Sequence, residues 1–310
     1  MSNKPICWVL TGPTASGKTS LSIRLAKEHH CEIVCMDSMQ IYRGMDIGTA
    51  KPTAAEMDGV PHHMLDVADP TEPFSVARYQ EMAEEAIAGI HRRGHRALLV
   101  GGTGLYLRAL RHPMAMGMVT GDEDLRRKLE AQAEQTDGRS TLHARLQEID
   151  PETAARLHVN DVRRVVRALE VYELTGIPFS KQPQVEVEAP FRYRVVSLTM
   201  DREKLYQRIE QRVDAMMADG LVDEVRRLLD SGVPADAQAM KAIGYKEIVP
   251  YLEGEYSLEK AVYELKLGTR HYAKRQLTWM RREEDVLWVD SLQPDAYQQM
   301  ETWFLQGEEA

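Results

Sequence analysis

The sequence predicts an α/β fold: a P-loop NTPase-like parallel sheet flanked by helices, with an all-helical insertion. Short apolar runs alternate with helical segments in the first third of the chain, which is the order of a parallel sheet covered by helices. A glycine-rich loop joins the first apolar run to the first helical segment. A charged stretch without strand character follows in the middle. We expect core segments at residues 1–118 and 191–310, and the insertion at residues 119–190.

Five short apolar runs predict the strands of the sheet. Each has the length of a strand; the third runs directly into glycines, and the first is followed by Gly12 after one residue. In chain order the predicted strands are Ile6–Leu10, Glu32–Met36, Arg96–Val100, Tyr193–Met200 and Val286–Asp290, the last of them at an edge.

Helical periodicity fills most of the remaining chain. Helices are predicted over Lys18–Glu28, over Ser75–Arg93 with a stop at Gly94, and from Ser257 to about residue 282. From about Asp122 the chain is helical and charged until a proline-punctuated exit. This change of character is the basis for the expected insertion.

Composition narrows the class of protein. The 310 residues are 43% hydrophobic and 28% charged, as in a globular protein with a sizeable core. No apolar run approaches the roughly 18 residues of a membrane span, and the start of the chain is too short for a signal peptide. Three cysteines without a CxxC pair indicate reduced thiols, so we expect a cytoplasmic protein without a zinc site.

The net charge of −9 argues only mildly against nucleic-acid binding. Affinity for nucleic acid follows local clusters of Lys and Arg rather than the total charge of the chain.

The glycine-rich loop matches the phosphate-binding pattern GxxxxGK[ST] at every fixed position, between a predicted strand and a predicted helix. Its backbone N–H groups and the positive end of the helix would converge on an anion. Lys18 would meet the outer phosphate, and the hydroxyl of Thr19 would hold Mg²⁺. Such loops are typical of ATP- and nucleotide-binding proteins. The predicted phosphate-binding residues are Gly12, Pro13, Thr14, Ala15, Ser16, Gly17, Lys18 and Thr19.

One feature of nucleotide-hydrolysing P-loop enzymes is missing. Those enzymes usually carry an acidic residue at the end of a later strand, where it helps to hold the metal. Here the strand Arg96–Val100 runs into Gly101, Gly102 and Thr103. Hydrolysis of ATP is therefore not the favoured activity.

Asp37 follows the second predicted strand, at the sheet edge where parallel α/β folds bind ligands. A carboxylate there could hold Mg²⁺ or act as a general base, although a helix cap or a solvated loop acid is the common role of an aspartate. Thr103, at the tip of the third strand, could hydrogen-bond the same nucleophile.

The stretch DVRRVVRALEV predicts an amphipathic helix capped by Asp161. Its valines and Leu169 form the buried face, and its arginines fall on the opposite side. A basic stripe of this kind is either a solvated face or a nucleic-acid contact.

Seven motifs together resemble bacterial tRNA dimethylallyltransferases, in the same order and across nearly the whole chain. They are GPTASGKT, DSMQIYRGMDIGTAKP, PHHMLD, LLVGGTGLY, RRVVRALEV, KAIGYKE and KRQLTWMRR. The resemblance implies transfer of a dimethylallyl group from dimethylallyl diphosphate to N6 of the adenosine 3′ of the anticodon (A37 of the tRNA), with Mg²⁺. The loop would then hold a departing diphosphate. We expect a monomer without membrane contacts that binds the tRNA anticodon stem-loop.

The resemblance also assigns roles to residues. Asp37 is the expected general base, Thr103 lies beside it, and Arg212, with Arg208 as its neighbour, binds the diphosphate. The residues expected to contact tRNA are Asp37, Ser38, Met39, Gln40, Thr103, Arg126, Arg163, Arg164, Val165, Val166, Arg167, Lys274 and Arg275. One departure is Val162, at the start of its helix, where relatives often have proline.

Three other functions stay open at this point. A kinase would need an acidic metal ligand after a strand. A prenyltransferase acting on free adenine nucleotides would not need the stripe Arg163–Arg167. A nucleotide-gated RNA-binding module would leave Asp37 and Thr103 without a task.

Overall fold

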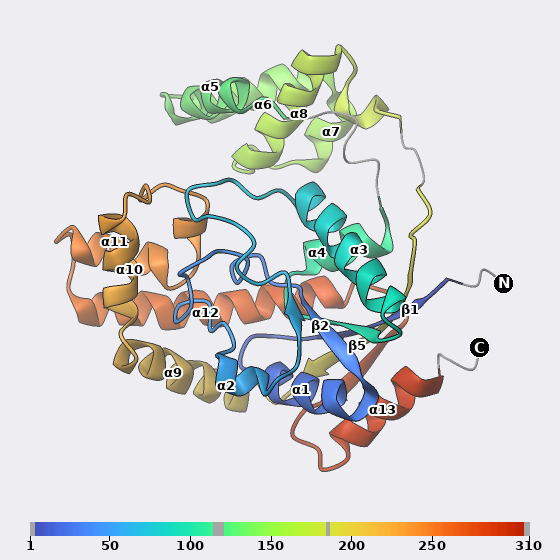
Figure 1. The fold of residues 1–310 in the computed structure, drawn as a ribbon. Helices are drawn as coiled ribbons and strands as arrows, with labels where there is room; N and C mark the ends of the chain where they lie inside the picture. The colour runs from blue at the N-terminus through green and yellow to red at the C-terminus, as the bar shows by residue number, and fades with distance from the viewer. Residues whose placement is uncertain (1–3, 114–120, 184–186, 307–310) are drawn as a thin grey trace. The chain divides into compact units, whose positions relative to one another are not determined.

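The computed structural model describes residues 4–113, 121–183 and 187–306 (Figure 1). The chain forms two compact units, one from residues 1–112 and 189–310 and the other from Pro113–Glu188. The expected boundary between residues 118 and 119 lies outside the described residues. The other boundary is expected after residue 190, and the second unit ends at Glu188.

The first unit is built on a six-stranded sheet in which every pairing is parallel, with the order β3-β2-β4-β1-β5-β6. β1 lies between β4 and β5, so the phosphate loop that follows β1 leaves from the middle of the sheet. The strands are β1 (Ile6–Thr11), β2 (Cys31–Cys35), β3 (His62–His63), β4 (Arg96–Val100), β5 (Arg192–Thr199) and β6 (Val286–Asp290).

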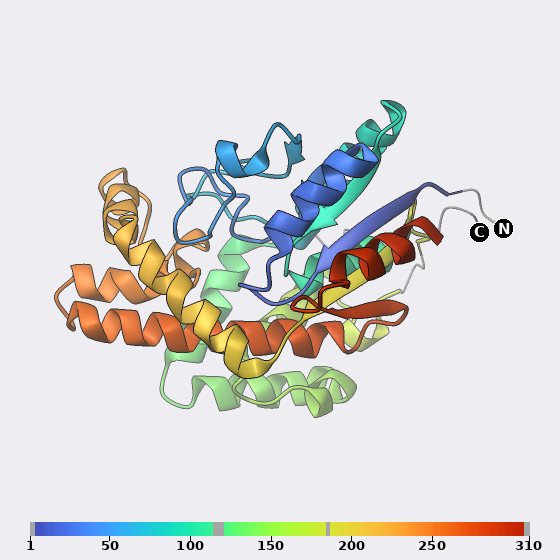
Figure 2. The same cartoon turned by 90° about the horizontal axis from the view of Figure 1, so that it is seen from below.

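Helices cover both faces of this sheet and extend beyond it (Figures 1 and 2). Those of the first unit are α1 (Lys18–His29), α2 (Ala54–Met57), α3 (Val76–Arg92), α4 (Gly104–Arg111), α9 (Arg202–Ala218), α10 (Leu221–Asp230), α11 (Tyr245–Leu252), α12 (Leu258–Met280) and α13 (Ala296–Gln306), with a 3₁₀ turn, η2 (Ala239–Lys241).

The alternation of side chains along β1 divides the core into two layers. Trp8 points to the layer that contains α1 and α13, where it stacks on Phe304 with ring centroids 4.9 Å apart. Cys7 and Val9 point to the opposite layer, which contains α3 and α4. Both faces of β1 are therefore buried, as the continuous apolar run predicts.

Because all strands are parallel, the segments that follow β1, β2 and β4 leave from the same edge of the sheet. These segments are the phosphate loop, the turn at Asp37 and the Gly101–Gly102 turn. Ligands of open α/β sheets bind at this edge.

The second unit is a helical bundle with its own core. Leu129, Leu142, Leu146 and Leu169 are among its buried side chains. Its elements are α5 (Glu123–Glu134), α6 (Gly138–Ile149), α7 (Pro151–Arg156), α8 (Val162–Thr175) and the 3₁₀ turn η1 (Phe179–Lys181).

The predicted fold class is confirmed, and the five predicted strands are all present. The prediction missed β3, which is only two residues long. Asp161 is the N-cap residue of α8, as predicted, but its side chain makes no capping bond and instead accepts a hydrogen bond from Arg164 at 3.1 Å. No helix within the described residues is long and apolar enough to cross a membrane.

Candidate active site

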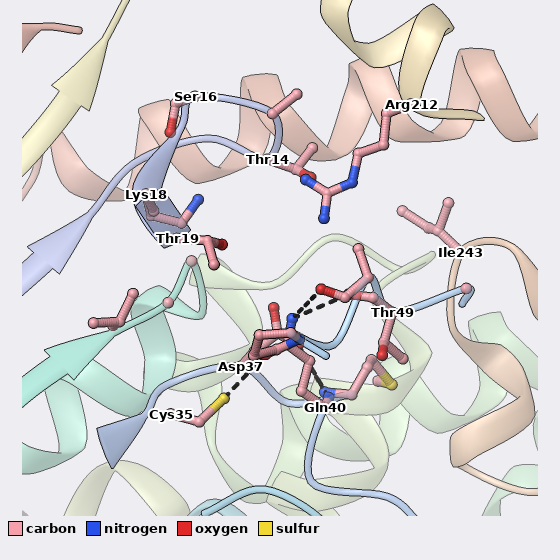
Figure 3. A pocket seen from close by; sticks show the side chains of 18 of the residues that line it. Thr14, Ser16, Lys18, Thr19, Cys35, Asp37, Gln40, Thr49, Arg212 and Ile243 are labelled. Carbon is pink, nitrogen blue, oxygen red and sulfur yellow. Dashed lines mark hydrogen bonds between the residues drawn. The ribbon is translucent and has the colours of Figure 1, made fainter. Parts of the chain in front are cut away.

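A cavity of about 820 Å³ opens at the carboxyl edge of the sheet (Figure 3). All of its lining residues belong to the first unit. They come from the phosphate loop, the segments after β2 and β4, and helices α9 and α12. The cavity therefore gathers segments that lie far apart in the sequence.

The phosphate loop forms one wall of the cavity. Residues Thr14, Ala15, Ser16, Gly17, Lys18 and Thr19 line it. Gly12 and Pro13 are not among the lining residues described, but their carbonyl oxygens accept hydrogen bonds from Lys18 Nζ at 3.0 and 2.8 Å. Gly12 has φ 140°, and a Cβ there would lie 2.9 Å from the carbonyl oxygen of Leu198. Only glycine fits this tight curl.

The environment of Lys18 weakens its positive charge. Burial, and to a smaller extent the nearby Arg212, lower its pKa to about 7, and the carboxylate of Asp37 opposes the shift. In the absence of an anion, the Lys18 amine is hydrogen-bonded to the carbonyl oxygens of Gly12 and Pro13. A bound diphosphate would supply the negative charge that this wall lacks.

Helix α1 presents free N–H groups to the cavity. It begins after Gly17, without a side-chain cap and without an acidic residue in its first turn. The first-turn N–H groups of a helix need acceptors, and a phosphate provides them. Thr19, in this first turn, is exposed and lines the cavity.

Asp37 lines the cavity opposite the loop and has a fixed orientation. Its Oδ1 accepts the backbone N–H groups of Met39 at 2.9 Å and Gln40 at 3.4 Å. The hydrogen bonds of this carboxylate, among the described residues, all end on Oδ1. Oδ2 is therefore left to accept a proton from a ligand.

Arg212, on α9, reaches into the same space as Lys18 and Thr19 (Figure 3). Burial lowers its pKa, and the negative charges of Asp37 and Glu56 oppose this shift. Arg208, one turn earlier, lies outside the lining, with its guanidinium near Gly17. The geometry thus separates the two arginines: Arg212 faces the cavity and Arg208 lies against the loop.

Thr103 has a supporting position beside the cavity. It is the residue before α4 and is not among the lining residues described. Its Oγ1 accepts the backbone N–H of Ser38 at 3.0 Å and donates to the hydroxyl of the same residue at 3.4 Å. Thr103 therefore holds the segment that carries Asp37.

Gln276 is a site residue that the sequence analysis missed. Its side chain is buried, and its Oε1 accepts the N–H of Thr14 at 2.9 Å while its Nε2 donates to the carbonyl of Gly102 at 3.2 Å. It thereby ties the phosphate loop to the turn after β4. A sequence separation of 262 residues between Gln276 and Thr14 leaves no local signal.

Ser38, Met39 and Gln40 all line the cavity, as expected of residues that meet a ligand. Gln40 also has an internal task, because its Nε2 donates to the carbonyls of Thr49 and Ala50 at 3.1 Å each. Those two residues form a further part of the wall.

A second hollow, of about 420 Å³, runs along α12 next to the cavity. Lys274 and Arg275 are exposed in it, together with His271 and Arg282. Arg275 lines both spaces, so the basic hollow adjoins the cavity at this side chain.

The remaining residues expected to contact tRNA lie in the second unit. Some of their side chains are exposed, and others are bound or buried within the unit. Arg163 and Arg164 are exposed on α8. The guanidinium groups of Arg126 and Arg167 bind the buried carboxylate of Glu170 at 2.9 and 2.6 Å. The sequence analysis did not identify Glu170.

The expectation for Val165 and Val166 needs correction. Their side chains are 2% and 1% exposed and pack in the core of the second unit. Apolar side chains at this helical spacing stabilise the bundle, so these two side chains are not available to RNA.

Comparison with known proteins places the chain in a family. The family model described as IPP transferase matches residues 40–283. The tRNA dimethylallyltransferase of Desulforudis audaxviator is 53% identical over 291 residues, which are 94% of this chain and 93% of that protein. The tRNA dimethylallyltransferase of Halalkalibacterium halodurans is 50% identical over 288 residues, 92% and 91% of the two chains.

Two solved structures are similar over nearly the whole chain. A tRNA isopentenylpyrophosphate transferase from Bacillus halodurans is 44% identical, with a TM-score of 0.73 and 99% coverage of both chains. A eukaryotic dimethylallyltransferase acting on tRNA is 30% identical, with a TM-score of 0.81 over 98% of this chain and 79% of that one.

Proposed function

The chain belongs to the IPP transferase family, which includes the tRNA dimethylallyltransferases, and from this premise we propose the reaction that its cavity performs. It is a tRNA prenyltransferase. The dimethylallyl group of dimethylallyl diphosphate is transferred to N6 of the adenosine 3′ of the anticodon, and diphosphate is released.

One observation carries this proposal: anion-binding groups and a carboxylate line a single cavity. Lys18, Arg212 and the first turn of α1 supply positive charge and N–H donors, and Asp37 supplies a proton acceptor. The cavity also has apolar walls, among them Met216, Ile243 and Leu265, which suit a five-carbon isoprenoid.

The nitrogen N6 forms a bond to the allylic C1 of the donor, the bond from C1 to the diphosphate oxygen breaks, and the N6 proton moves to Asp37 Oδ2. Neutral N6 is a poor nucleophile because its lone pair is delocalised into the ring, so a base assists it. Lys18 and Arg212 stabilise the charge that grows on the leaving diphosphate.

Mg²⁺ fits the donors that the cavity offers. This ion prefers hard oxygen ligands and commonly binds one protein oxygen together with phosphate oxygens and water. The exposed hydroxyl of Thr19, beside Lys18, is the residue that would hold it with the diphosphate. When bound, the ion would neutralise part of the leaving group's charge.

The tRNA would approach along basic side chains. Lys274 and Arg275 are exposed in the hollow along α12, Arg275 also lines the cavity, and Arg163 and Arg164 are exposed on the second unit. The target adenine must leave its stack to reach Asp37, as in other enzymes that act on bases. A monomer in the cytoplasm is the proposed working form.

The turn after β4 disfavours the kinase alternative. A Cβ at Gly101 would lie 2.0 Å from the carbonyl oxygen of Met36, and one at Gly102 would lie 1.8 Å from Gln276 Nε2. The backbone of Met36 leaves no space at Gly101 for the acidic side chain that helps to hold the metal in many P-loop NTPases, and at Gly102 such a side chain would displace Gln276.

A labelling experiment tests the proposed reaction. The protein is incubated with Mg²⁺, unmodified tRNA and dimethylallyl diphosphate that carries the label in its isoprenoid carbons, and the tRNA is digested and sequenced by mass spectrometry. We expect label on the adenosine 3′ of the anticodon and one diphosphate released for each label incorporated.

Two controls separate the alternatives. Free AMP replaces tRNA in one reaction, and ATP replaces the isoprenoid donor in the other. Label on AMP at a rate comparable to tRNA, or phosphorylation of any acceptor by ATP, would contradict the proposal.

A further inference from the structure

Glu224, on α10, is a buried carboxylate in the first unit without a direct role in the proposed chemistry. It is 2% exposed and is not among the residues that line the cavity. No lysine or arginine of the described residues pairs with it. A buried charge needs compensation from hydrogen bonds when no counter-charge is present.

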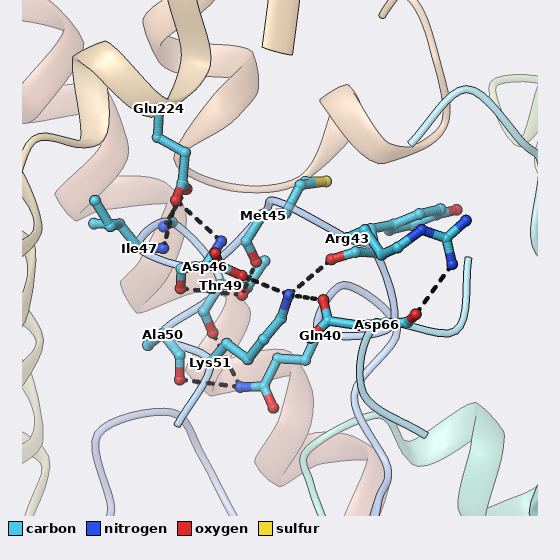
Figure 4. Close-up of polar contacts among 12 residues, drawn as sticks. Gln40, Arg43, Met45, Asp46, Ile47, Thr49, Ala50, Lys51, Asp66 and Glu224 are labelled. Carbon is cyan, nitrogen blue, oxygen red and sulfur yellow. Dashed lines mark hydrogen bonds and ion pairs between the residues drawn. The ribbon is translucent and has the colours of Figure 1, made fainter. Parts of the chain in front are cut away.

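That compensation comes from one loop, shown in Figure 4, and from one hydroxyl. Glu224 Oε2 accepts the backbone N–H groups of Asp46 at 3.0 Å and Ile47 at 2.8 Å. Oε1 accepts the N–H of Gly48 at 3.0 Å and the hydroxyl of Tyr245 at 2.6 Å. Three consecutive N–H groups thus converge on one side chain that is 176 to 178 residues away in the sequence.

The loop held in this way continues into the wall of the cavity. Gly48, Thr49 and Ala50 line it. The carbonyls of Thr49 and Ala50 hold the side chain of Gln40, whose backbone N–H donates to Asp37. Hydrogen bonds, linked through the backbone of the loop and through Gln40, therefore lead from Glu224 to the proposed base.

Lys51 anchors the far end of the same loop. Its side chain is 5% exposed, and its Nζ donates to the carbonyl of Tyr42 at 2.8 Å and to Asp46 and Asp66 at 2.6 Å each (Figure 4). The segment from Asp46 to Lys51 is fixed at both ends by buried charged groups.

We propose that Glu224 is a positioning residue for prenyl transfer, which holds the loop Asp46–Ala50 so that Gln40 and Asp37 keep their reactive arrangement. The assignment of the reaction rests on the proposed function. The hydrogen bonds that tether the loop do not depend on it.

A carboxylate suits this task and an amide does not. An ionised carboxylate offers only acceptor sites, and four donors meet it here. In Glu224→Gln the new NH₂ group would face backbone N–H groups, and at least one buried donor would lose its acceptor. The substitution keeps the size of the side chain, so it tests the hydrogen bonds and not the packing.

The first measurement is hydrogen exchange of the backbone amides in the full-length protein without substrate. In Glu224→Gln the amides of Asp46, Ile47 and Gly48 should exchange at least about tenfold faster than in the native protein. Tyr245→Phe removes only one donor, so its effect on these amides should be smaller.

The second measurement is steady-state kinetics at a temperature where each variant is folded. We expect kcat of Glu224→Gln to fall about tenfold to a hundredfold, because a small displacement of a catalytic group lowers the rate by this order. Its affinity for inorganic diphosphate should remain native, because the phosphate loop does not contact Glu224. Tyr245→Phe should lower kcat less.

Glu32→Gln is the matched control. Glu32 is 4% exposed and binds Arg93, His63 and His95, yet it does not line the cavity. This variant should lose stability while keeping the native kcat and native exchange of the loop amides.

Three results would overturn the proposal. They are native protection of the loop amides in Glu224→Gln, faster exchange of these amides with native kcat, and an equal loss of kcat in Glu32→Gln. If the native protein transfers no dimethylallyl group, the proposed function fails instead, and the exchange data alone decide whether Glu224 holds the loop.

Discussion

Lys18 shows how the cavity controls the charge of a single residue. Its amine lies on the carbonyls of Gly12 and Pro13, and burial lowers its pKa to about 7. Below that pH the side chain is charged and ready for an anion. Above that pH the Lys18 amine of the free enzyme is largely neutral. A bound diphosphate favours the charged form, so binding is accompanied by uptake of a proton.

The pH dependence of diphosphate binding follows from this shift. As the pH rises from 6 to 9 through the Lys18 pKa of about 7, affinity for inorganic diphosphate should fall more steeply in the native protein than in Lys18→Arg. Arginine remains charged throughout this range. Comparing the two proteins cancels the titration of the ligand itself.

Calorimetry at pH 8, in buffers of different ionisation enthalpy, measures the protons exchanged on binding. The native protein should take up more protons per diphosphate than Lys18→Arg. Equal uptake by the two proteins would show that Lys18 does not titrate on binding.

Asp37 provides the sharpest test of the chemistry. In Asp37→Asn, Oδ1 still accepts the N–H groups of Met39 and Gln40, but the side chain no longer takes a proton. Turnover should fall by about 10²–10⁴, the range typical of a lost general base, while tRNA affinity is retained. Asp58→Asn, at another aspartate that lines the cavity, is the control and should keep its turnover. Normal turnover in Asp37→Asn would exclude Asp37 as the base.

At the scale of one element, α8 combines two functions in a short sequence. Its valines build the core of the second unit, Arg167 neutralises buried Glu170, and Arg163 and Arg164 face solvent. The pairing of Arg164 with Asp161 lies at the surface, where an ion pair contributes little to stability and leaves the arginine available.

Substitutions on α8 should therefore separate binding from stability. Arg163→Ala should weaken tRNA binding and reduce by about 1 the slope of log affinity against log salt concentration, as the loss of one phosphate contact does. Arg167→Ala should lower the free energy of unfolding by about 1–3 kcal/mol, because it removes a partner of a buried carboxylate. Filter binding at several salt concentrations and urea unfolding measure the two effects. A destabilised Arg163→Ala with unchanged salt dependence would contradict this division.

Most elements of the fold could be predicted from the sequence, because their signals are local. Apolar runs marked β1, β2 and β4 to within about a residue, and the loop pattern located the start of α1. The residues that were missed act over long sequence separations. Glu170, Glu224 and Gln276 each look like an ordinary helix residue, and only the folded chain brings their side chains to Arg126, Gly48 and Thr14.

The same limit affected the predicted site. Residues adjacent to strand ends, such as Asp37 and the phosphate loop, were placed correctly beside one cavity because the topology of a parallel sheet fixes that edge. Thr103 was expected beside the same nucleophile as Asp37 but supports Ser38 rather than lining the cavity. The buried face predicted for the valines of α8 is confirmed for Val165 and Val166, which is why their side chains are not available to RNA.

At the scale of the whole molecule, the two units differ in what they contain. Every lining residue of the cavity belongs to the first unit, and the second unit has a separate core. Basic side chains are available on both units, although the chain carries a net charge of −9. Local groups and not the total charge determine affinity for RNA.

Removing the second unit tests this division. In a chain in which a flexible Gly-Ser linker replaces residues 113–188, inorganic diphosphate should bind with about native affinity, because the cavity is intact. Affinity for tRNA should fall at least about tenfold, because the exposed arginines of α8 are gone. Calorimetry and filter binding measure the two affinities. Loss of diphosphate binding in a shortened chain with a native-like circular dichroism spectrum would contradict the prediction.

The crowded turn at Gly101 and Gly102 has a consequence for how this active site could change in evolution. Backbone and an amide already occupy the volume where many phosphate-loop relatives place a metal-binding acid. Gaining triphosphate hydrolysis by that route would require moving the backbone at Met36 if Gly101 were replaced, or the side chain of Gln276 if Gly102 were replaced. A single amino-acid substitution in this turn would more readily yield a misfolded transferase than a new hydrolase. The crowded turn therefore makes it difficult for this enzyme to evolve into an ATPase by single substitutions.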